Sequence, residues 1–579
     1  MSKVIGIDLG TTFSSVAFLN DGKPEIIPDA KGRKSLPSVL VFSEDTVFSG
    51  YEALKYELKY PENVVRRVKR KMGTGEKIKI NDRTYSPEEL SSFILKELKK
   101  IAENYLNEKI FEAVITVPAY FNDNQRQATK IAGELAGLKT TRIINEPTAA
   151  ALAYGMRGNE EQNIVVYDLG GGTFDVSILT VSDGIFEVVA TCGDNNLGGE
   201  DFNKRIEEIV LERFYKETGI DLKADPLAIA KLGNAIEQAK IELSTKEKTN
   251  IYVPFITADE NGPKDLDFEI TRNEFEEMIV DYVDRTIELC QESLSDAGLT
   301  IKEIDRIILV GGSSKIPYIR KRVSEFFKKE ADLSVDPEYS VARGAAIQAG
   351  IIQGEKEGLI LVDVIPLSLG IEVENRYFVP IIERNTPIPT CAKRIFTTVT
   401  DFQKSVEIHI LQGESMYAKN NVSLGKFKLE GIREAKKGVP RIEVIFEIDV
   451  NGILSVSAVD VDTKITQNIT IKNESFLTKD EVDKLQKDKR LKAEIDRRKS
   501  LFEVMKLKTY AENLMDRIKT TLPPLYYNML VNQELEEIKF SVMRNEEEQN
   551  LDDLKRQIDR LEFILSEIST DKNFYQEVV

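Results

Sequence analysis

The 579-residue chain has no tryptophan, a single histidine and only three cysteines. His409 lies in an alternating, strand-like stretch, which argues against Ser-His-Asp catalysis, and a lone histidine excludes metal sites built from several histidines. Cys192, Cys290 and Cys391 are too far apart for a C-x-x-C pair or a disulfide framework, and fit a reducing compartment. Magnesium remains compatible with this composition, because it needs only oxygen ligands.

Long apolar runs and an excess of basic charge are also missing. No run approaches the roughly 18 apolar residues of a membrane-spanning helix, and an apolar strand already begins at Val4, which leaves no room for a signal peptide. The 97 acidic residues outnumber the 79 basic ones, giving a net charge of −18. Phosphate-backbone binding needs basic side chains, so nucleic acid is not expected as the main ligand. We therefore expect a multidomain cytoplasmic protein that binds neither nucleic acid nor membrane.

Two stretches, VIGIDLGTT at residues 4–12 and VVYDLGGGT at residues 165–173, are near copies of each other. In each, a strand-like apolar run delivers an aspartate, Asp8 or Asp168, to a turn of glycine and threonine. Such turns let backbone N–H groups approach phosphate oxygens, and the aspartate can hold magnesium through its water shell. A second apolar stretch follows each turn, which predicts two hairpins. Neither a dinucleotide-binding signature nor a P-loop is present.

Residues 3 to about 355 mix apolar strands with helical segments and predict an α/β region. A third apolar strand, Ile307–Val310, ends in Gly311-Gly312-Ser313-Ser314, and this turn is expected to face the first two. The expected helices span residues 86–106, 125–136, 201–218 and 225–243.

An apolar segment, residues 358–364, follows the α/β region. A simple spacer would be polar, so this segment is expected either to dock on a surface or to be an edge strand. From 366 to about 476 the hydrophobic period is two, which predicts an all-β domain. Beyond it, a capping box at Thr478–Glu481, a break at Pro523–Pro524 and an amphipathic pattern over 551–568 predict a helical bundle.

Eight motifs make the chain similar to the seventy-kilodalton heat-shock (Hsp70) chaperones, in particular their bacterial, DnaK-type members. They lie at residues 5–12, 117–121, 144–151, 168–175, 197–202, 310–313, 366–370 and 411–414. The resemblance implies an α/β actin-like (ribonuclease H-like) ATPase domain of two lobes. It also implies a β-sandwich domain that binds substrate and an α-helical lid. The implied boundaries are 1–357 for the ATPase domain, 358–365 for a hydrophobic linker, 366–476 for the β-sandwich and 477–579 for the lid.

The resemblance implies ATP or ADP with Mg²⁺ between the two turns, and K⁺ is a further candidate cation. Asp8 and Asp168 would hold hydrated magnesium with Asp175 nearby, and Lys69 and Glu146 would position the attacking water. Considered alone, Lys69 belongs to a basic run typical of a solvated face, and Glu146 to a helix start. The phosphates would contact Gly10, Thr11, Thr12, Gly170, Gly171, Gly172 and Thr173, and Thr173 is also a candidate for autophosphorylation.

By the same resemblance, several side chains would bind the nucleoside. Glu237, Lys240 and Ser244 lie at i, i+3 and i+7 on one helix face, where a surface ion pair is the alternative interpretation. Lys315 replaces the family's usual arginine, whose planar guanidinium stacks better on adenine, so this departure bears on nucleotide affinity. The full implied set is Gly199, Glu237, Lys240, Ser244, Gly311, Gly312, Ser313 and Lys315.

In the β domain, the resemblance implies a groove for extended hydrophobic peptide. Glu374 and Val399 would arch over this groove. Glu374 replaces a usually apolar residue, and we hypothesise that its carboxylate disfavours acidic peptides and admits basic ones. The lining residues would be Ile371, Phe396, Val406, Ile408 and Ile442, each of which, considered alone, is typical of a buried core.

The implied activity is that of an ATP-driven chaperone, which binds and releases unfolded segments and assists folding and the stress response. Its implied partners are unfolded client polypeptides, a J-domain co-chaperone and a GrpE-type nucleotide exchange factor. Coupling between ATPase and groove would run through Leu359, Ile360, Leu361, Val362 and Asp363, with Pro118 and Arg126 on the ATPase side.

Two departures leave room for a specialised DnaK-type paralogue. Ile365 replaces the family's usual threonine, and no long polar tail precedes Val579. The alternatives are a small-molecule kinase of the actin-like superfamily and an actin-like filament protein. Neither alternative explains a hydrophobic linker, a β domain and helices after residue 358.

Overall fold

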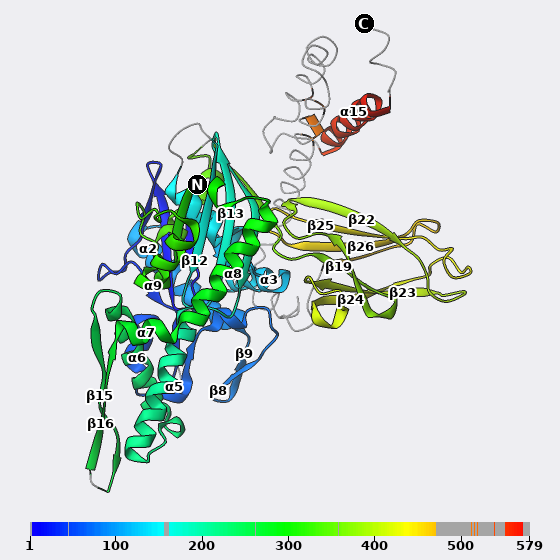
Figure 1. The fold of residues 1–579 in the computed structure, drawn as a ribbon. Coiled ribbons are helices and arrows are strands. Elements are labelled where there is room, and N and C mark those ends of the chain that lie inside the picture. The colour runs from blue at the N-terminus through cyan, green and yellow to red at the C-terminus, as the bar shows by residue number, and fades with distance from the viewer. Residues whose placement is uncertain are drawn as a thin grey trace. The chain divides into compact units, whose positions relative to one another are not determined.

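The computed structural model describes residues 3–43, 46–155, 161–260, 262–356, 358–470 and 551–570, together with the isolated positions 511, 514, 515, 518 and 538. The chain forms two compact units, Met1–Phe476 and Leu477–Val579 (Figure 1). Among the described residues, no helix is both long enough and apolar enough to cross a bilayer. The predicted capping box at Thr478–Glu481 and the break at Pro523–Pro524 lie outside the described residues.

The first sheet of the larger unit has the strand order β11-β10-β1-β2-β3, with β4 also paired to β2. Strand β1 is antiparallel to β2 and parallel to β10. Asp8 ends β1, so the glycine turn connects β1 to β2 as the predicted hairpin. The bounds are Val4–Asp8 for β1, Phe13–Asn20 for β2, Lys23–Ile26 for β3, Leu36–Pro37 for β4, Glu112–Val117 for β10 and Lys139–Asn145 for β11.

The second sheet has the order β17-β12-β13-β14-β18-β21 and repeats this arrangement. Strand β12 is antiparallel to β13 and parallel to β17, so the repeat seen in the sequence is also a repeat of topology. The second predicted hairpin is thereby confirmed. The bounds are Gln162–Leu169 for β12, Phe174–Ser182 for β13, Ile185–Asp194 for β14, Arg306–Val310 for β17, Ile360–Val364 for β18 and Pro387–Ile388 for β21.

Two alanine-rich helices, α4 (Glu146–Tyr154) and α10 (Ser340–Ile352), share a buried core with strands of both sheets. They approach closely where Gly344 of α10 faces Ala149 of α4. A Cβ placed on Gly344 would lie 1.6 Å from the Ala149 carbonyl oxygen. Glycine is therefore required here for packing.

The four predicted helices are confirmed as α2 (Pro87–Leu106), α3 (Asp123–Leu135), α5 (Gly199–Thr218) and α6 (Pro226–Leu243). A long hairpin, β15–β16, projects beside α6 and α7 (Figure 1). Its strands span Lys248–Asp259 and Gly262–Thr271, and the neighbouring helices are α7 (Arg272–Met278), α8 (Val280–Ala297) and α9 (Pro317–Phe327). Shorter elements are β5 (Val39–Phe42), β6 (Val47–Ser49), α1 (Tyr51–Tyr56), β7 (Val64–Arg66), β8 (Ile78–Ile80) and β9 (Arg83–Tyr85).

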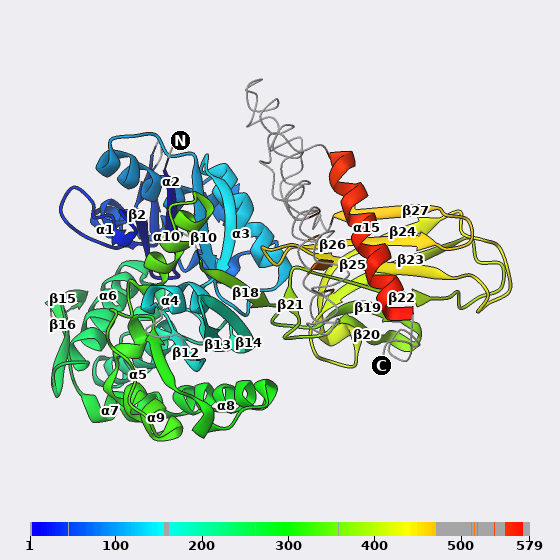
Figure 2. The ribbon, with the colours of Figure 1, turned by 90° about the horizontal axis from the view of Figure 1, so that it is seen from above.

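The predicted all-β region consists of two four-stranded sheets, β20-β19-β23-β24 and β22-β25-β26-β27, which share one apolar core (Figure 2). His409 lies on β23, as expected. The bounds are Leu369–Val373 for β19, Tyr377–Ile382 for β20, Thr390–Phe396 for β22, Ser405–Gln412 for β23, Val422–Glu430 for β24, Ile442–Ile448 for β25, Leu454–Asp460 for β26 and Thr466–Thr470 for β27.

In the second unit, the predicted amphipathic helix is confirmed as α15 (Leu551–Thr570). Leu554, Ile558 and Leu561 are buried, which is the expected apolar stripe.

Gly344→Ala is expected to destabilise the larger unit by about 1–3 kcal/mol, because the methyl group forces α10 away from α4. The matched control is Gly233→Ala in α6, where a Cβ meets nothing within 4 Å. That change should stabilise the larger unit by about 0.4–1 kcal/mol, because alanine favours the helix more than glycine does. Thermal unfolding of both variants is the measurement, and equal shifts would contradict the packing argument.

Candidate functional site

The two repeated glycine turns approach each other closely at the expected nucleotide cleft, and the third turn contacts the second. A Cβ on Gly171 would lie 2.0 Å from Thr12 Oγ1, and one on Gly172 would lie 2.5 Å from Thr11 Oγ1. Ser313 Oγ donates a hydrogen bond to the Gly170 carbonyl at 2.9 Å. The turn after β17 therefore contacts the second of the two turns, as expected, and its position relative to the first turn stays a prediction. Side chains larger than glycine would fill this cradle.

At the floor of the cleft, Lys69 Nζ binds Glu146 Oε1 at 2.6 Å. Lys69 lies on the short helix Val68–Lys71 and is only 4% exposed, so its interpretation as part of a solvated basic face was wrong. Glu146 opens α4, as the sequence pattern suggested. Asp168 and Asp175, at facing positions of β12 and β13, are also buried.

The cleft holds more negative than positive charge, and this excess, together with burial, shifts the pKa values of its side chains. Burial and then the charge of Glu146 raise the pKa of Asp8 to about 7, and the same two causes raise the pKa of Asp175 to about 7. Burial, Glu146 and the other two aspartates raise the pKa of Asp168 well above its usual value. Burial opposes a charged Lys69, but Glu146 and Asp8 outweigh it and raise the pKa of the ammonium.

Two buried oxygen atoms in the cleft have no hydrogen-bond partner among the described residues: Thr12 Oγ1 and Asp175 Oδ2. The other oxygen of Asp175 accepts the Tyr120 N–H at 2.9 Å. Buried polar atoms are nearly always paired, so these two point to a polar ligand. Carboxylates in excess, a free hydroxyl and a glycine cradle fit a hydrated divalent cation and a phosphate chain.

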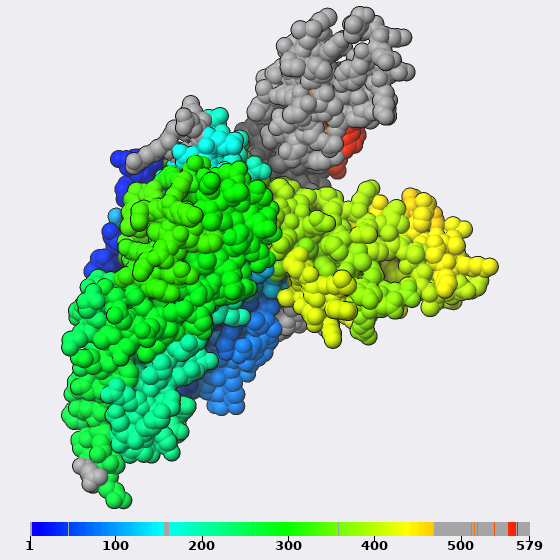
Figure 3. All heavy atoms as spheres, in the orientation of Figure 1, coloured from blue at the N-terminus to red at the C-terminus, as the bar shows by residue number. Residues whose placement is uncertain are grey.

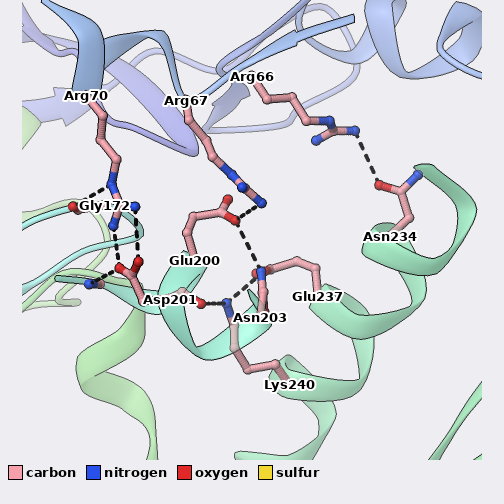
Figure 4. A network of polar contacts seen from close by, with 12 residues as sticks. Arg66, Arg67, Arg70, Gly172, Glu200, Asp201, Asn203, Asn234, Glu237 and Lys240 are labelled. Atoms are coloured by element: carbon pink, nitrogen blue, oxygen red, sulfur yellow. Dashed lines mark hydrogen bonds and ion pairs between the residues drawn. The ribbon is translucent and has the colours of Figure 1, made fainter. Parts of the chain in front are cut away.

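Three arginines next to Lys69 cross the cleft to helices α5 and α6 (Figure 4). Arg70 Nε donates to the Gly172 carbonyl at 2.8 Å, and its guanidinium also binds Asp201. Arg67 forms an ion pair with Glu200, and Arg66 contacts both Asn234 and Glu57. Sequence reasoning missed these contacts, because the run of basic residues gave no sign of which acids it would meet.

Part of the implied nucleoside set is assembled at the N-terminus of α5. Lys240 Nζ donates to the Gly199 carbonyl at 3.1 Å and pairs with Glu237 at 2.7 Å. A Cβ on Gly199 would lie 2.4 Å from Ser313 Oγ. Lys240 is buried, so this ion pair is not a surface pair.

The remaining members of the nucleoside set lie nearby in the fold. Ser244 caps the C-terminus of α6, and a Cβ on Gly311 would contact the Leu169 carbonyl. Gly312 faces open space. Lys315 pairs with Glu338 at 3.0 Å and with Asp336 at 3.2 Å.

The apolar linker segment is strand β18, which extends the second sheet. Ile360, Leu361 and Val362 pair in parallel with β14, so the segment docks on the sheet. Strand β21 pairs with Asp363 and Val364 and is the last strand of this sheet, so the alternative interpretation of the segment as an edge strand was wrong. Asp363 is buried and accepts hydrogen bonds from Asn145 Nδ2 at 2.7 Å and Thr148 Oγ1 at 3.1 Å.

On the side of the first sheet, Arg126 donates to Asn145 Oδ1 at 2.6 Å and to the Ala119 carbonyl at 3.1 Å. Pro118 is buried next to it and its carbonyl accepts the Phe121 N–H. Asn145 and Thr148 were not singled out in the sequence, although both lie in the motif at 144–151.

The β-sandwich packs directly against the α/β region (Figure 3). Asp123, the first residue of α3, donates its N–H to Gln412 at 3.1 Å and accepts the Leu454 N–H at 2.8 Å. Ile143 N–H donates to Asn451 Oδ1 at 3.0 Å. These three contacts join α3 and β11 to the strand ends of the sandwich.

A second contact lies beside α8. Arg384 binds Glu292 at 3.0 Å and Asp296 at 2.7 Å. Cys192, Glu292 and Asp296 could offer ligand atoms within 4.8 Å of one another. However, Arg384 already neutralises the two carboxylates, so the cluster forms an interface between domains.

The five implied groove residues lie in one cluster of the sandwich. Ile371, Ile408 and Ile442 are buried, and Phe396 and Val406 are half-buried against them. Glu374 and Val399 lie outside this cluster on the surface, with Val399 52% exposed.

Asp175→Asn is expected to change the pH dependence of stability. Its folded pKa of about 7 exceeds its usual 3.8, so between these values the folded protein binds more protons than the unfolded chain. This contribution to stability is present below about pH 4 and is lost as the pH rises through about 7. Asn does not ionise, so the variant does not lose this stability at high pH. Near pH 8 its free energy of unfolding should exceed that of wild type by on the order of 1 kcal/mol.

The measurement is the free energy of unfolding against pH, without added divalent cation. Asp82→Asn, at an exposed position of the turn between β8 and β9, is the control and should follow the wild type. Parallel curves for wild type and Asp175→Asn would show that burial does not raise the pKa of this carboxyl.

The glycine cradle, the charged cleft and the docked linker agree with a comparison against protein families. The model of the family described as Hsp70 protein matches residues 4–79 and 74–573. The chain therefore belongs to the Hsp70 family, whose members are ATP-dependent chaperones.

Proposed function

We propose that this protein hydrolyses ATP in the cleft and couples hydrolysis to binding and release of unfolded polypeptide. The observation that carries the proposal is the meeting of two glycine turns over one buried lysine and four carboxylates. Phosphoryl transfer needs positioning and charge stabilisation more than covalent chemistry, and this cleft supplies both.

In this proposal, Asp8 and Asp168 hold hydrated Mg²⁺ with Asp175 beside them, and the cation would neutralise phosphate charge. The phosphates contact Thr11, Thr12 and the glycines of both turns. Lys69 and Glu146 orient the attacking water, because their ion pair fixes an ammonium and a carboxylate at the cleft floor. Thr173, at the end of the second turn, is proposed as an autophosphorylation site, and K⁺ as an accessory cation.

The nucleoside would lie over Gly199, Lys240 and Ser313, which already form a polar group beside the phosphate turns. Glu237 and Ser244 extend this group along α6. Lys315 is tied to two acidic residues, which supports a weaker contact with the base than the family's arginine would make.

Coupling to the β-sandwich would run through the linker. We propose that the docked arrangement seen here corresponds to the ATP-bound form, and that hydrolysis releases β18 and the sandwich. The support is Asp363, whose buried carboxylate accepts hydrogen bonds from side chains of β11 and α4 in addition to the Val364 N–H of its own strand. Release would free the groove around Ile371, Phe396, Val406, Ile408 and Ile442 to close on a client.

The same proposal keeps the domain boundaries 1–357, 358–365, 366–476 and 477–579, with the last as a lid. A J-domain protein and a GrpE-type exchange factor are the proposed partners, and the cytoplasm is the proposed location. The exposed positions of Glu374 and Val399 are compatible with an arch over the groove.

Lys69→Met is expected to slow ATP hydrolysis by roughly 100-fold or more, because it removes the ammonium that positions water and stabilises charge. Nucleotide affinity should change by no more than about 3-fold, since binding involves many other groups. Single-turnover hydrolysis and equilibrium binding of labelled ATP measure the two quantities. Lys71→Met, two residues away and exposed beside Glu76, should leave both unchanged. Comparable rates for the two variants would contradict the assignment.

Asp363→Ala is expected to abolish stimulation of the ATPase by an unfolded peptide while leaving the basal rate within about 3-fold of wild type. The reason is that docked β18 loses its hydrogen bonds to Asn145 and Thr148. Glu355→Ala, whose side chain is exposed just before the linker, is the control and should retain stimulation. Full stimulation in Asp363→Ala would show that coupling follows another route.

A further inference from the structure

Three large side chains at one end of the β-sandwich form an exposed apolar patch. Tyr377 is 41% exposed, Met416 66% and Tyr417 51%. Large exposed apolar groups that gather in one place, unlike scattered ones, mark interaction sites. We refer to these three residues as the Tyr377–Tyr417 patch. None of them belongs to the proposed groove lining.

The patch is an ordered structure. The rings of Tyr377 and Tyr417 stack with centroids 5.9 Å apart and an interplanar angle of 29°. The backbones of the two tyrosines form an isolated β-bridge, and Phe378 N–H donates to the Met416 carbonyl at 2.9 Å. The loop that carries Met416 and Tyr417 is thereby fixed to β20.

The patch continues the apolar face on which the groove residues lie. Tyr377 of β20 is directly opposite Val373 of β19, and Ile371 lies two residues before Val373. Directly paired residues, and residues two apart, point to the same face of a sheet. The side chains of Ile371, Val373 and Tyr377 therefore lie on one face of the sheet, which is buried at Ile371 and exposed to solvent at Tyr377.

The direction of the neighbouring strand places the patch at the groove end of the sheet. Strand β23 runs antiparallel to β19, with Ile371 opposite Ile410. As β19 proceeds from Ile371 to Val373, β23 therefore returns from Ile410 toward Ile408 and Val406. Ile408 and Val406 are two of the five proposed lining residues.

The turn that leads into Tyr377 is strained. Asn375 and Arg376, between β19 and β20, have left-handed φ values of 64° and 63°. Such backbone is costly for residues other than glycine, and arginine has no local compensation of the kind asparagine has. An ion pair between Arg376 and Glu372 at 3.6 Å supports the turn. Strain of this kind gathers at functional segments.

We propose that the Tyr377–Tyr417 patch is an accessory subsite that receives an aromatic side chain of the client polypeptide, next to the hydrophobic groove. The inference rests on the proposed chaperone function. Two tyrosine rings offer edge and face contacts to a third ring, and the Met416 thioether adds a favourable sulfur–aromatic contact. The patch thereby selects clients with an aromatic residue outside the segment that fills the groove.

The test uses the full-length protein with ADP and two synthetic peptides. Both contain the same extended apolar core, flanked at each end by phenylalanine in one and by serine in the other. Wild type should bind the phenylalanine-flanked peptide about 3- to 10-fold more tightly, because one aromatic contact is worth about 0.5–1.5 kcal/mol. Fluorescence anisotropy gives both affinities.

Tyr417→Ser combined with Met416→Ser should remove this preference and leave the affinity for the serine-flanked peptide unchanged. Unchanged binding of that peptide also shows that the variant is folded. The control is Tyr252→Ser on the distant β15–β16 hairpin, a tyrosine of similar exposure, which should retain the preference. A second variant, Met416→Lys, should reduce the preference in part.

Persistence of the preference in the double variant would overturn the inference. A double variant that keeps the preference but loses self-association in sedimentation experiments would also overturn it, and would assign the patch to contacts between copies of the chain. If wild type binds neither peptide, the proposed chaperone function itself fails, and this outcome is distinct from the other two.

Discussion

The hydrogen bond from Asn145 Nδ2 to Asp363 Oδ1, 2.7 Å long, is the interaction on which the arrangement of the larger unit depends. Asp363 belongs to the linker strand, and its buried carboxylate needs donors. Asn145 is the last residue of β11, and the next residue, Glu146, binds Lys69 at the cleft floor. Adjacent residues of one segment therefore contact the linker strand and Lys69, which supports the proposed coupling between the two.

The sheet provides a second connection between the same two places. Asp168 lies on β12, Asp175 on β13, and β14 is the next strand before the linker strand β18. Undocking of β18 exposes the backbone edge of β14, which is unfavourable unless water or another strand replaces it. Arg384 and Asp123 add contacts from the β-sandwich to the same unit. Docking of the linker strand and the β-sandwich therefore depends on several polar contacts that form at the same time.

Local features of this architecture were predictable, and contacts distant in sequence were not. The hairpins after Asp8 and Asp168 follow from apolar runs that end in glycine turns, which is information within a few residues. The burial of Lys69 could not be predicted from the local sequence pattern. Its acidic partners come from other elements, and only the family resemblance indicated them. The partners of Arg67 and Arg384 depend on how distant elements pack. The linker was expected either to dock or to be an edge strand, and the fold shows that it docks between β14 and β21.

We propose that the linker strand docks on β14 when ATP is bound and is released after hydrolysis. Amide hydrogen exchange of residues 360–364 tests it most directly, because strand pairing protects these amides. We expect strong protection of these amides with ATP and fast exchange with ADP, and loss of this difference in Asn145→Ala. Equal protection of these amides in the two nucleotide states would contradict it.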